Sequence, residues 1–355
     1  MIRATCIPYQ LHFKRPGGTS RGVLRQKETW FIRLEDTDTG KVGIGETGLF
    51  RGLSYDDRPE YAQKIQQVCG AIQDWDSLNV SLSQLTDWPS IRFGLESAYL
   101  ALQADKEWEL FPSAFTRSEA GIPINGLIWM GDPAFMKEQI QEKIQAGFRC
   151  LKLKIGALDF DKEIEILSEI RKTFDPSELE IRVDANGAFS PAETLDKLKR
   201  LNRFHLHSIE QPIRAGQLDE MKDLVSKTPF PIALDEELIG VTRPEDQDRL
   251  LTEIQPQYII LKPALVGGLE ASRTWIRKAE ERGMGWWITS ALESNIGLNA
   301  IAQFTYSLQT DRYQGLGTGQ LFTNNISSPL EIRDAHLYYG TGEWEVQSLN
   351  WNDPS

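Results

Sequence analysis

The chain has 355 residues, of which 40% are hydrophobic, and its formal net charge at pH 7 is −12. This length exceeds that of an ordinary small domain and fits a large barrel with a second, smaller domain. The acidic balance argues against nucleic acid as a partner, and no apolar run reaches the length of a membrane span or a signal core. We therefore expect a cytoplasmic enzyme that acts on a small molecule, with no membrane partner and an oligomeric state that the sequence does not indicate.

The first 120 residues predict an α+β region. Strands at residues 30–34 and 42–46 flank a turn-forming segment at 36–40, which together indicate a β-hairpin. Two helical patterns follow, at about residues 61–75 and 90–103, and Ser90 is the expected N-cap of the second helix.

Two segments of this first region are rich in glycine and polar residues, at 15–22 and 47–52. Each is either a mobile connection or a lid that closes over a bound ligand. Neither matches a phosphate-binding loop. In the lid interpretation, Ser20 is a candidate substrate-binding residue.

From residue 121 onward, short apolar strands alternate with helical segments, which is typical of a parallel α/β barrel. Eight strands are predicted, near residues 122–129, 150–155, 179–184, 207–210, 231–235, 258–262, 285–289 and 314–317. A helix is expected at 162–174, and another begins at the capping box Ser190-Pro191-Ala192-Glu193. A strand-like segment at 335–339 predicts that the tail packs back on the first region.

Charged residues stand at the ends of five consecutive predicted strands, 25 to 30 residues apart: Lys154, Asp184, Glu210, Asp235 and Lys262. One βα unit of such a barrel takes that much chain, since eight units occupy roughly 250 residues. The charges therefore fall on one rim of the barrel, which is where its active site lies. Three neighbouring carboxylates repel one another, so Asp184, Glu210 and Asp235 are predicted to bind Mg²⁺, with Mn²⁺ as the alternative.

The lysines of this rim predict proton transfer. Lys152 and Lys154 are two residues apart on one strand, so both side chains point into the barrel, and Lys262 should face Lys154 across the mouth. A lysine near another cation and a metal ion has a lowered pKa and can act as a base. Two lysines with a metal between them suit enolate formation beside a bound carboxylate. Asn186 is either an ordinary turn residue or a support for the metal site.

These motifs resemble the enolase superfamily, in which a lysine base works with Mg²⁺. The residues that carry the resemblance are Lys152-Leu153-Lys154, Asp184-Ala185-Asn186, Glu210-Gln211-Pro212, Leu234-Asp235-Glu236, Lys262-Pro263 with Gly267-Gly268, and Ser290-Ala291-Leu292-Glu293-Ser294. The resemblance covers nearly the whole chain and is closest to the muconate lactonizing enzyme subgroup, which has lysines on both sides of the metal. It implies a TIM-like (β/α)₇β barrel at residues 121–327 and an α+β capping domain made of residues 1–120 and the tail at about 328–355.

Within this subgroup, segments 92–96 and 124–129 are most similar to dehydratases that make o-succinylbenzoate for menaquinone biosynthesis. That resemblance implies a syn dehydration in which Lys154 removes the α proton and returns it to the departing hydroxyl. It also implies that Lys262 stays protonated and stabilises the enediolate, while Lys152 lies near the substrate carboxylate. The residues expected to contact the succinyl tail are Thr289, Ser290 and Gly315.

Other functions stay open at this point. N-succinylamino acid racemase, dipeptide epimerase and muconate cycloisomerase are alternatives within the subgroup. Dipeptide epimerases carry Asp-x-Asp near the last strand, where this chain has Gly315-Leu316-Gly317-Thr318-Gly319. A Schiff-base aldolase with Lys154 or Lys262 as nucleophile leaves the carboxylates unexplained, and a non-catalytic metal-binding barrel needs no opposed lysines.

Overall fold

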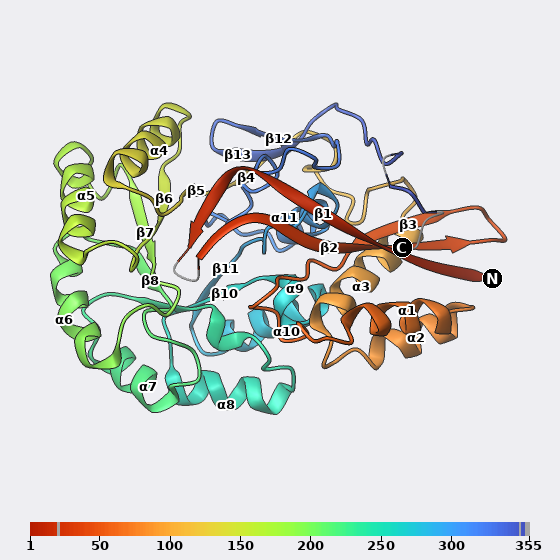
Figure 1. Cartoon of the computed structure of the whole chain (residues 1–355), viewed down its shortest axis with the longest axis horizontal. Helices are drawn as coiled ribbons and strands as arrows, with labels where there is room; N and C mark the ends of the chain where they lie inside the picture. The colour runs from red at the N-terminus through yellow and green to blue at the C-terminus, as the bar shows by residue number, and fades with distance from the viewer. Residues whose placement is uncertain (20–21, 348, 352–355) are drawn as a thin grey trace.

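The computed structural model describes residues 1–19, 22–347 and 349–351. Figure 1 shows a barrel built from the middle of the chain, with its helices on the outside, and the N-terminal sheet and helices beside it. The long hairpin of β1 (Ile2–Thr19) and β2 (Gly22–Asp36) extends from the N-terminal part towards the first barrel strands (Figure 1).

The N-terminal sheet is antiparallel, in the order β1-β2-β3, with β3 at Val42–Glu46. The predicted hairpin at residues 30–34 and 42–46 is confirmed, because β2 pairs with β3 over these residues. The segment at residues 15–22 is not a loop as far as Thr19, while a lid role for it stays a prediction. The chain there continues as β1 and pairs with β2 after a register shift between His12 and Gly17.

Three helices pack against this sheet: α1 (Tyr61–Ala71), α2 (Trp75–Ser83) and α3 (Pro89–Gln103). The helix predicted at 61–75 is confirmed as α1 but ends earlier, at Ala71, and α2 was not predicted. Ser90 is not an N-cap, because α3 already begins at Pro89, whose missing N–H costs nothing in a first turn. The backbone N–H and hydroxyl of Ser90 instead donate to Asp56 Oδ2 at 2.9 and 2.7 Å.

The barrel sheet is parallel and runs in the order β11-β10-β9-β8-β7-β6-β5. Its strands are β5 (Gly126–Ile128), β6 (Cys150–Lys154), β7 (Glu180–Asp184), β8 (Ser208–Glu210), β9 (Ile232–Leu234), β10 (Tyr258–Leu261) and β11 (Gly285–Ile288). The helices that follow them are α4 (Pro133–Gln145), α5 (Phe160–Thr173), α6 (Pro191–Asn202), α7 (Leu218–Lys227), α8 (Pro244–Ile254), α10 (Leu269–Glu280) and α11 (Asn295–Ser307), with the short η1 (Glu236–Leu238) and α9 (Pro263–Val266). Parallel neighbours require such crossover helices, which cover the outside of the barrel (Figure 1).

The predicted eighth strand closes the barrel through two parallel bridges. Gln314 bridges Ile124, just ahead of β5, and Gly315 bridges Thr289, just after β11. The first predicted strand, at 122–129, is divided because the chain changes partners within it. β4 (Ile122–Pro123) pairs with the tail, whereas β5 pairs with β6.

The turn after β7 positions two polar residues and starts the next helix. Asn186 and Gly187 have φ values of 45° and 74°, a conformation that glycine adopts readily. A Cβ at Gly187 would also lie 2.9 Å from Arg214 Cα, so this turn requires glycine. The predicted capping box is confirmed: Ser190 N donates to Glu193 Oε1 at 3.2 Å ahead of α6.

The C-terminal tail contacts both parts of the molecule. Strands β12 (Leu330–Arg333) and β13 (His336–Tyr339) form a hairpin, and β13 pairs with β4. The Trp344 indole stacks on Trp108 with ring centroids 4.3 Å apart. The domain boundaries near residues 120 and 328 stay predictions. No helix in the described part of the chain combines the length and the apolar character needed to cross a bilayer.

Candidate active site

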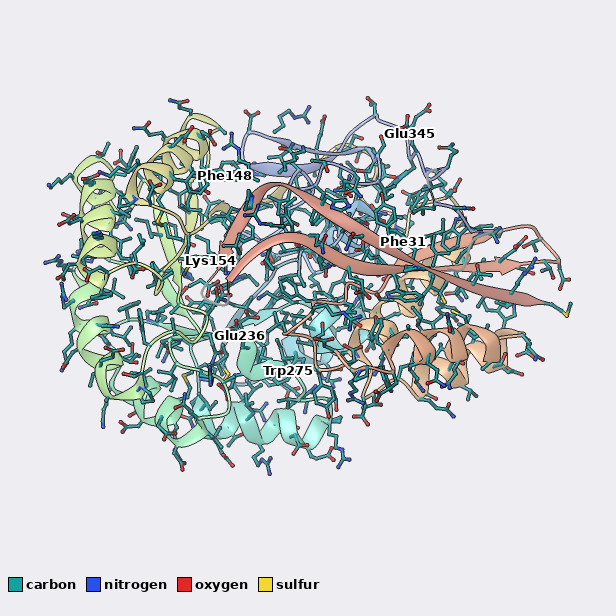
Figure 2. All side chains as sticks on the ribbon, viewed as in Figure 1. Phe31, Phe148, Lys154, Glu236, Trp275 and Glu345 are labelled. Carbon is teal, nitrogen blue, oxygen red and sulfur yellow. The ribbon has the colours of Figure 1, made fainter. Side chains whose placement is uncertain are left out.

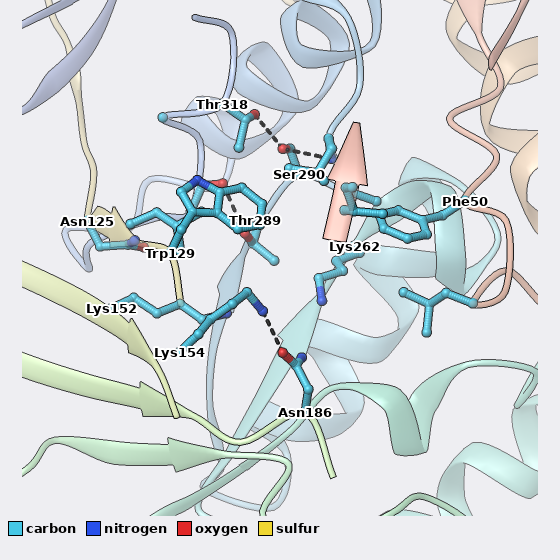
Figure 3. A pocket seen from close by; sticks show the side chains of 17 residues that line it. Phe50, Asn125, Trp129, Lys152, Lys154, Asn186, Lys262, Thr289, Ser290 and Thr318 are labelled. Carbon is cyan, nitrogen blue, oxygen red and sulfur yellow. Dashed lines mark hydrogen bonds between the residues drawn. The ribbon is translucent and has the colours of Figure 1, made fainter. Parts of the chain in front are cut away.

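A cavity of about 80 Å³ lies where the carboxyl ends of the barrel strands meet the N-terminal part. It is lined by Leu24, Phe50, Leu53, Asn125, Leu127, Trp129, Lys152, Lys154, Asn186, Lys262, Thr289, Ser290, Ala291, Leu292, Gly315, Gly317 and Thr318. Figure 3 shows Lys152 and Lys154 on one side of this cavity and Lys262 on the other. The structure thus places the three predicted lysines around one space.

Strand β6 brings two of these lysines to the barrel mouth. Leu151 and Leu153 alternate with them and are buried in the main core, so Lys152 and Lys154 point to the opposite face of the strand. Lys154 pairs in register with Asp184 of β7. Its side chain therefore leaves the sheet beside the first predicted metal ligand.

The three predicted metal ligands end neighbouring strands. Asp184 and Glu210 are the last residues of β7 and β8 and pair in register, while Asp235 directly follows β9. Their exposed fractions are 0%, 2% and 2%. Because a buried carboxylate is costly unless it is paired or bound to a metal, this cluster needs cations.

Lys152 and Lys154 supply part of that compensation. Lys152 Nζ lies 2.9 Å from Asp184 Oδ2 and 2.5 Å from Glu210 Oε2. Lys154 Nζ donates to the same Asp184 oxygen at 3.0 Å. Two lysines of one strand therefore share a single carboxylate.

Lys262, which follows β10, compensates the other end of the cluster. It donates to Asp235 and lies 3.9 Å from Glu210 Oε1. Among the described residues, Glu210 forms these ion pairs without an aligned hydrogen bond to either oxygen. It is thus the least satisfied carboxylate of the three.

The carboxylates differ in pKa for physical reasons. Burial, together with the charge of Asp184, raises the pKa of Glu210 to about 8. Burial would also raise the pKa of Asp184, but the charges of Lys152 and Lys154 outweigh it and hold that pKa well below its usual range. The same opposition, with Lys262 as the main cation, lowers the pKa of Asp235.

The lowered lysine pKa expected beside a metal ion stays a prediction, and the protein side chains by themselves shift the pKa of Lys262 in the other direction. Burial acts to lower the pKa of Lys262, but the charges of Asp235 and Glu210 outweigh burial and raise it. The pKa of Lys152 is raised in the same way, by Asp184 and Glu210. Carboxylates, and not a neighbouring cation, therefore dominate the charge that these two lysines experience.

The three carboxylates fit a divalent cation by chemistry. They offer only oxygen donors, which hard ions such as Mg²⁺ prefer. The weakly satisfied oxygens of Glu210 are groups that a cation would stabilise. As the side chains stand, the described residues contain no cluster of three or more His, Cys, Asp or Glu side chains poised to hold a metal ion. Lysine ammonium groups lie against these carboxylates instead.

Asn186 connects Lys154 to Glu236, a residue of the Leu234-Asp235-Glu236 motif to which the sequence analysis gave no role. Lys154 Nζ donates to Asn186 Oδ1 at 2.6 Å, as Figure 3 shows, and Asn186 Nδ2 donates to Glu236 Oε1 at 3.0 Å. Figure 2 labels Lys154 beside the tip of the long hairpin and Glu236 below that tip. Asn186 therefore orients Lys154. The position of Glu236 directly after the predicted metal ligand Asp235 is the sequence feature that could have indicated it.

Gln211 is a second residue that the sequence reading did not single out. Its side-chain oxygen accepts from the backbone N–H groups of Asp235 and Glu237 at 3.2 Å, and its nitrogen donates to Glu237 Oε2 at 3.0 Å. These bonds fix the chain where it leaves β9. Gln211 thus helps to orient Asp235.

The predicted substrate contacts Thr289, Ser290 and Gly315 all line the cavity and form one of its walls. Thr289 Oγ1 donates to Gly315 O at 2.9 Å, and the hydroxyls of Ser290 and Thr318 lie 2.6 Å apart. A Cβ at Gly315 would approach Thr289 Oγ1 to 2.0 Å, so the close packing of this wall requires glycine. Ser20 lies outside the described residues, so its place is not given.

Apolar residues form the rest of the cavity wall, and no sequence motif indicated that they would line a binding site. Leu24 comes from β2, and Phe50 and Leu53 come from the segment after β3. The second glycine-rich segment, at 47–52, therefore contributes Phe50 to the cavity wall. Trp129 closes the side next to β5 (Figure 3).

The fold and the site together define the class of protein. The family model described as "Enolase C-terminal domain-like" matches residues 135–342, and the chain belongs to the enolase superfamily. Members of this superfamily use a divalent metal ion, typically Mg²⁺.

Individual relatives are more specific. The chain is similar to o-succinylbenzoate synthase of Desulfotalea psychrophila, with 50% identity over 91% of this chain and 95% of the relative. It is also similar to o-succinylbenzoate synthase of Bacillus subtilis, with 24% identity over 85% of this chain and 83% of the relative.

Solved structures share the fold. MenC from Desulfotalea psychrophila matches with a TM-score of 0.83 and 45% identity, over 95% of this chain and 99% of that one. Muconate lactonizing enzyme from Pseudomonas fluorescens, complexed with muconolactone, matches with a TM-score of 0.82 and 25% identity, over 98% and 96% of the chains. The predicted barrel class and superfamily are thereby confirmed.

Proposed function

We propose that this chain is an o-succinylbenzoate synthase, a carbon–oxygen lyase of menaquinone biosynthesis. It would dehydrate 2-succinyl-6-hydroxy-2,4-cyclohexadiene-1-carboxylate to o-succinylbenzoate. The observation that carries the proposal is the opposition of Lys154 and Lys262 across one cavity, in a chain half identical to an enzyme of that name.

Asp184, Glu210 and Asp235 are the proposed ligands of a divalent ion, with Mg²⁺ preferred and Mn²⁺ as the alternative. When bound, such an ion supplies stabilisation of the negative charge that develops on the substrate carboxylate. Lys152, which is 8% exposed and held between Asp184 and Glu210, is proposed to contact the same carboxylate.

Lys154 is the proposed base and acid. Its amine takes the proton α to the carboxylate, which gives an enediolate, and the resulting ammonium returns the proton to the hydroxyl on the same face. The C–O bond then breaks, water leaves, and the ring becomes aromatic. Lys262 keeps its proton on the opposite face and stabilises the enediolate charge.

The remaining predicted residues orient the substrate or the base. Asn186 holds Lys154 through the 2.6 Å hydrogen bond to its ammonium group. Thr289, Ser290 and Gly315 are the proposed neighbours of the succinyl group, since all three line the cavity. Ser20 is kept as a further proposed contact.

N-succinylamino acid racemase is the second candidate, because lysines on both faces of a substrate also serve racemisation. In that reaction each lysine would exchange a proton in turn. Muconate cycloisomerase stays a further alternative, whereas a dipeptide epimerase has less support. Segment 315–319 supplies no acidic partner for a substrate amino group.

An ultraviolet assay of the conversion of the cyclohexadiene carboxylate to o-succinylbenzoate tests the proposal. We expect turnover that EDTA abolishes and added Mg²⁺ restores. Absence of turnover with Mg²⁺ or Mn²⁺, together with efficient racemisation of N-succinylamino acids, would replace the proposal by the second candidate.

A further inference from the structure

A second cavity, of about 330 Å³, adjoins the active-site cavity and carries three cationic side chains, Lys14, Arg15 and Lys143. We propose that this basic chamber binds the distal carboxylate of a dicarboxylic substrate, the group at the end of the succinyl chain. The inference rests on the proposed function, because that substrate has a second carboxylate to place.

The two cavities share a wall. Asn125, Leu127, Trp129 and Gly317 line both of them. Leu127 pairs in register with Lys152, so the shared wall begins beside the lysine proposed to contact the ring carboxylate. The inner cavity, at about 80 Å³, is smaller than the roughly 300–1,000 Å³ usual for ligand sites. A ring with two acidic substituents therefore needs adjoining space.

Lys143 is the best-placed cation of the chamber. It projects from α4, is half-buried, and lies with Nζ 5.1 Å from the centroid of the Phe148 ring. A Cβ at Gly126 would come within 3.1 Å of Lys143 Cγ, so this glycine makes room for the lysine stem. The stem thus passes directly over the start of β5.

Glu142 also lines this cavity, but no acidic side chain of the described residues forms an ion pair with Lys143. Among the interactions of the described residues, Lys143 has no ion pair and no hydrogen bond from its ammonium group. Burial lowers its pKa, and only the neighbouring Glu142 opposes that effect. A partly buried ammonium without an acidic partner is stabilised by an anionic ligand, through a charge-assisted hydrogen bond.

Backbone pairing holds the other two cations over the same space. Lys14 N donates to Leu321 O at 2.8 Å, and Gly18 bridges Met130 further along β1. The indole of Trp129 packs on the backbone of Gly17, where a Cβ would come within 2.9 Å of the ring. Lys14 and Arg15 form no ion pair in the described part of the chain, so both remain available to an anion.

Asn125 adds a polar group at the junction of the cavities. It is 5% exposed, and its side-chain oxygen has no hydrogen-bond partner among the described residues. Its side-chain nitrogen forms no hydrogen bond among the described residues either, so this nitrogen can donate to a ligand that passes from one cavity to the other.

The test compares two ligands that differ only at the distal carboxylate: o-succinylbenzoate and its distal methyl ester. Calorimetry with Mg²⁺ present would measure both affinities for the wild type, Lys143→Gln, Lys143→Arg and Arg15→Gln. Lys137→Gln is the matched control, because Lys137 lies on the same helix but pairs with Glu169 at 3.0 Å. Circular dichroism confirms folding of each variant.

We expect Lys143→Gln to weaken o-succinylbenzoate binding roughly tenfold, as for a lost charge-assisted hydrogen bond, and to leave ester binding unchanged. Lys143→Arg should retain most of the affinity, Arg15→Gln should show a smaller selective loss, and the control should behave as the wild type. In turnover, KM should rise in Lys143→Gln while kcat changes little.

Equal losses for the two ligands, or no loss for either, in Lys143→Gln would overturn the chamber proposal. A wild type that binds both ligands equally would overturn it as well, while leaving the proposed function intact. A wild type that binds neither ligand and turns over no precursor would refute the proposed function, and the chamber proposal with it.

Discussion

Strand β7 carries one charged side chain to each end of the barrel interior. Arg182 lies towards the amino end and Asp184 towards the carboxyl end, and side chains two residues apart point to the same face. Both are almost completely buried, with exposed fractions of 3% and 0%. The partners of the buried charge nevertheless differ between the two ends.

At the amino end the charge is fully enclosed by partners. Arg182 Nε donates to Glu180 Oε1 at 2.7 Å, and Nη1 donates to Tyr313 O at 3.0 Å. Its guanidinium carbon lies 4.3 Å from the centroid of the Trp287 ring. Tyr258 packs on the same ring, at 5.5 Å between centroids. We call this packed group of Glu180, Arg182, Tyr258, Trp287 and Tyr313 the plug, and we expect it to contribute to stability.

At the carboxyl end the charges are crowded and open to a cavity. Asp184 is shared by Lys152 and Lys154, and Glu210 accepts no aligned hydrogen bond. A buried polar network that is only partly satisfied is costly, so it persists where a ligand or reaction uses it. The comparison predicts that substitutions at the mouth alter chemistry and those at the plug alter stability.

The largest effect is expected from Asp235→Asn at the mouth. Substitution of residues that only contact a metal ligand lowers metal affinity by up to about 100-fold. Loss of a proposed ligand itself should therefore lower Mg²⁺ affinity by more than about 100-fold and should abolish turnover. Isothermal calorimetry and the ultraviolet assay measure both. Asp246→Asn, which alters an exposed carboxylate paired with Arg249 at 3.3 Å, is the control. Unchanged Mg²⁺ affinity in Asp235→Asn would contradict the metal assignment.

Arg182→Met should have the opposite profile. It removes the cation from the plug and leaves the charge of Glu180 without its ion-pair partner. The free energy of unfolding should therefore fall by about 2–3 kcal/mol, which is less than for a fully buried pair because Glu180 is partly exposed. Turnover at low temperature should stay within about twofold of the wild type, since no reacting atom is touched. Denaturant unfolding and kcat test this, and a large loss of kcat at unchanged stability would break the comparison.

The smallest expected effect is a pH dependence of the plug. Burial, and then the charge of Arg182, lowers the pKa of His207 to about 4, with Glu180 opposing and Arg312 assisting the shift. The unfolded chain binds this proton near pH 6.5, so stability present above that pH is lost as the pH falls towards the folded pKa.

This linkage predicts a loss of about 1 kcal/mol between about pH 7 and pH 5.5 that His207→Gln should remove. Denaturant midpoints at the two pH values measure the loss in both proteins. Identical pH dependence in wild type and variant would show that His207 is not the group responsible.

Much of the barrel was predictable because each strand is a short apolar run, and five consecutive ones end in a charge. Strand β1 was not, because its exposed and buried residues do not alternate regularly, although it pairs along the whole of β2, from Ile2 with Asp36 to Thr19 with Gly22. The division of the predicted first strand depends on pairing with β13, more than 200 residues away. The residue pattern within one segment cannot predict a pairing partner so distant in the sequence.

The same distinction explains the site. The carboxylates and lysines were predictable because their positions relative to strand ends bring them to one rim. Glu236 depends on the turn geometry of Asn186, and Phe50 and Leu24 reach the cavity from the N-terminal part. The effect of Asp235 and Glu210 on the pKa of Lys262 was not predictable, because the side-chain arrangement, and not the residue types, decides which charge lies nearest.

The central claim is that Lys154 moves the proton while Lys262 supplies charge. The most direct measurement is exchange of the α proton with deuterated water in a bound analogue that cannot eliminate, followed by NMR. We predict exchange in the wild type, none in Lys154→Ala, and reduced but measurable exchange in Lys262→Arg, which keeps a cation of different shape. Exchange that survives in Lys154→Ala and vanishes in Lys262→Arg would contradict the claim and reverse the two roles.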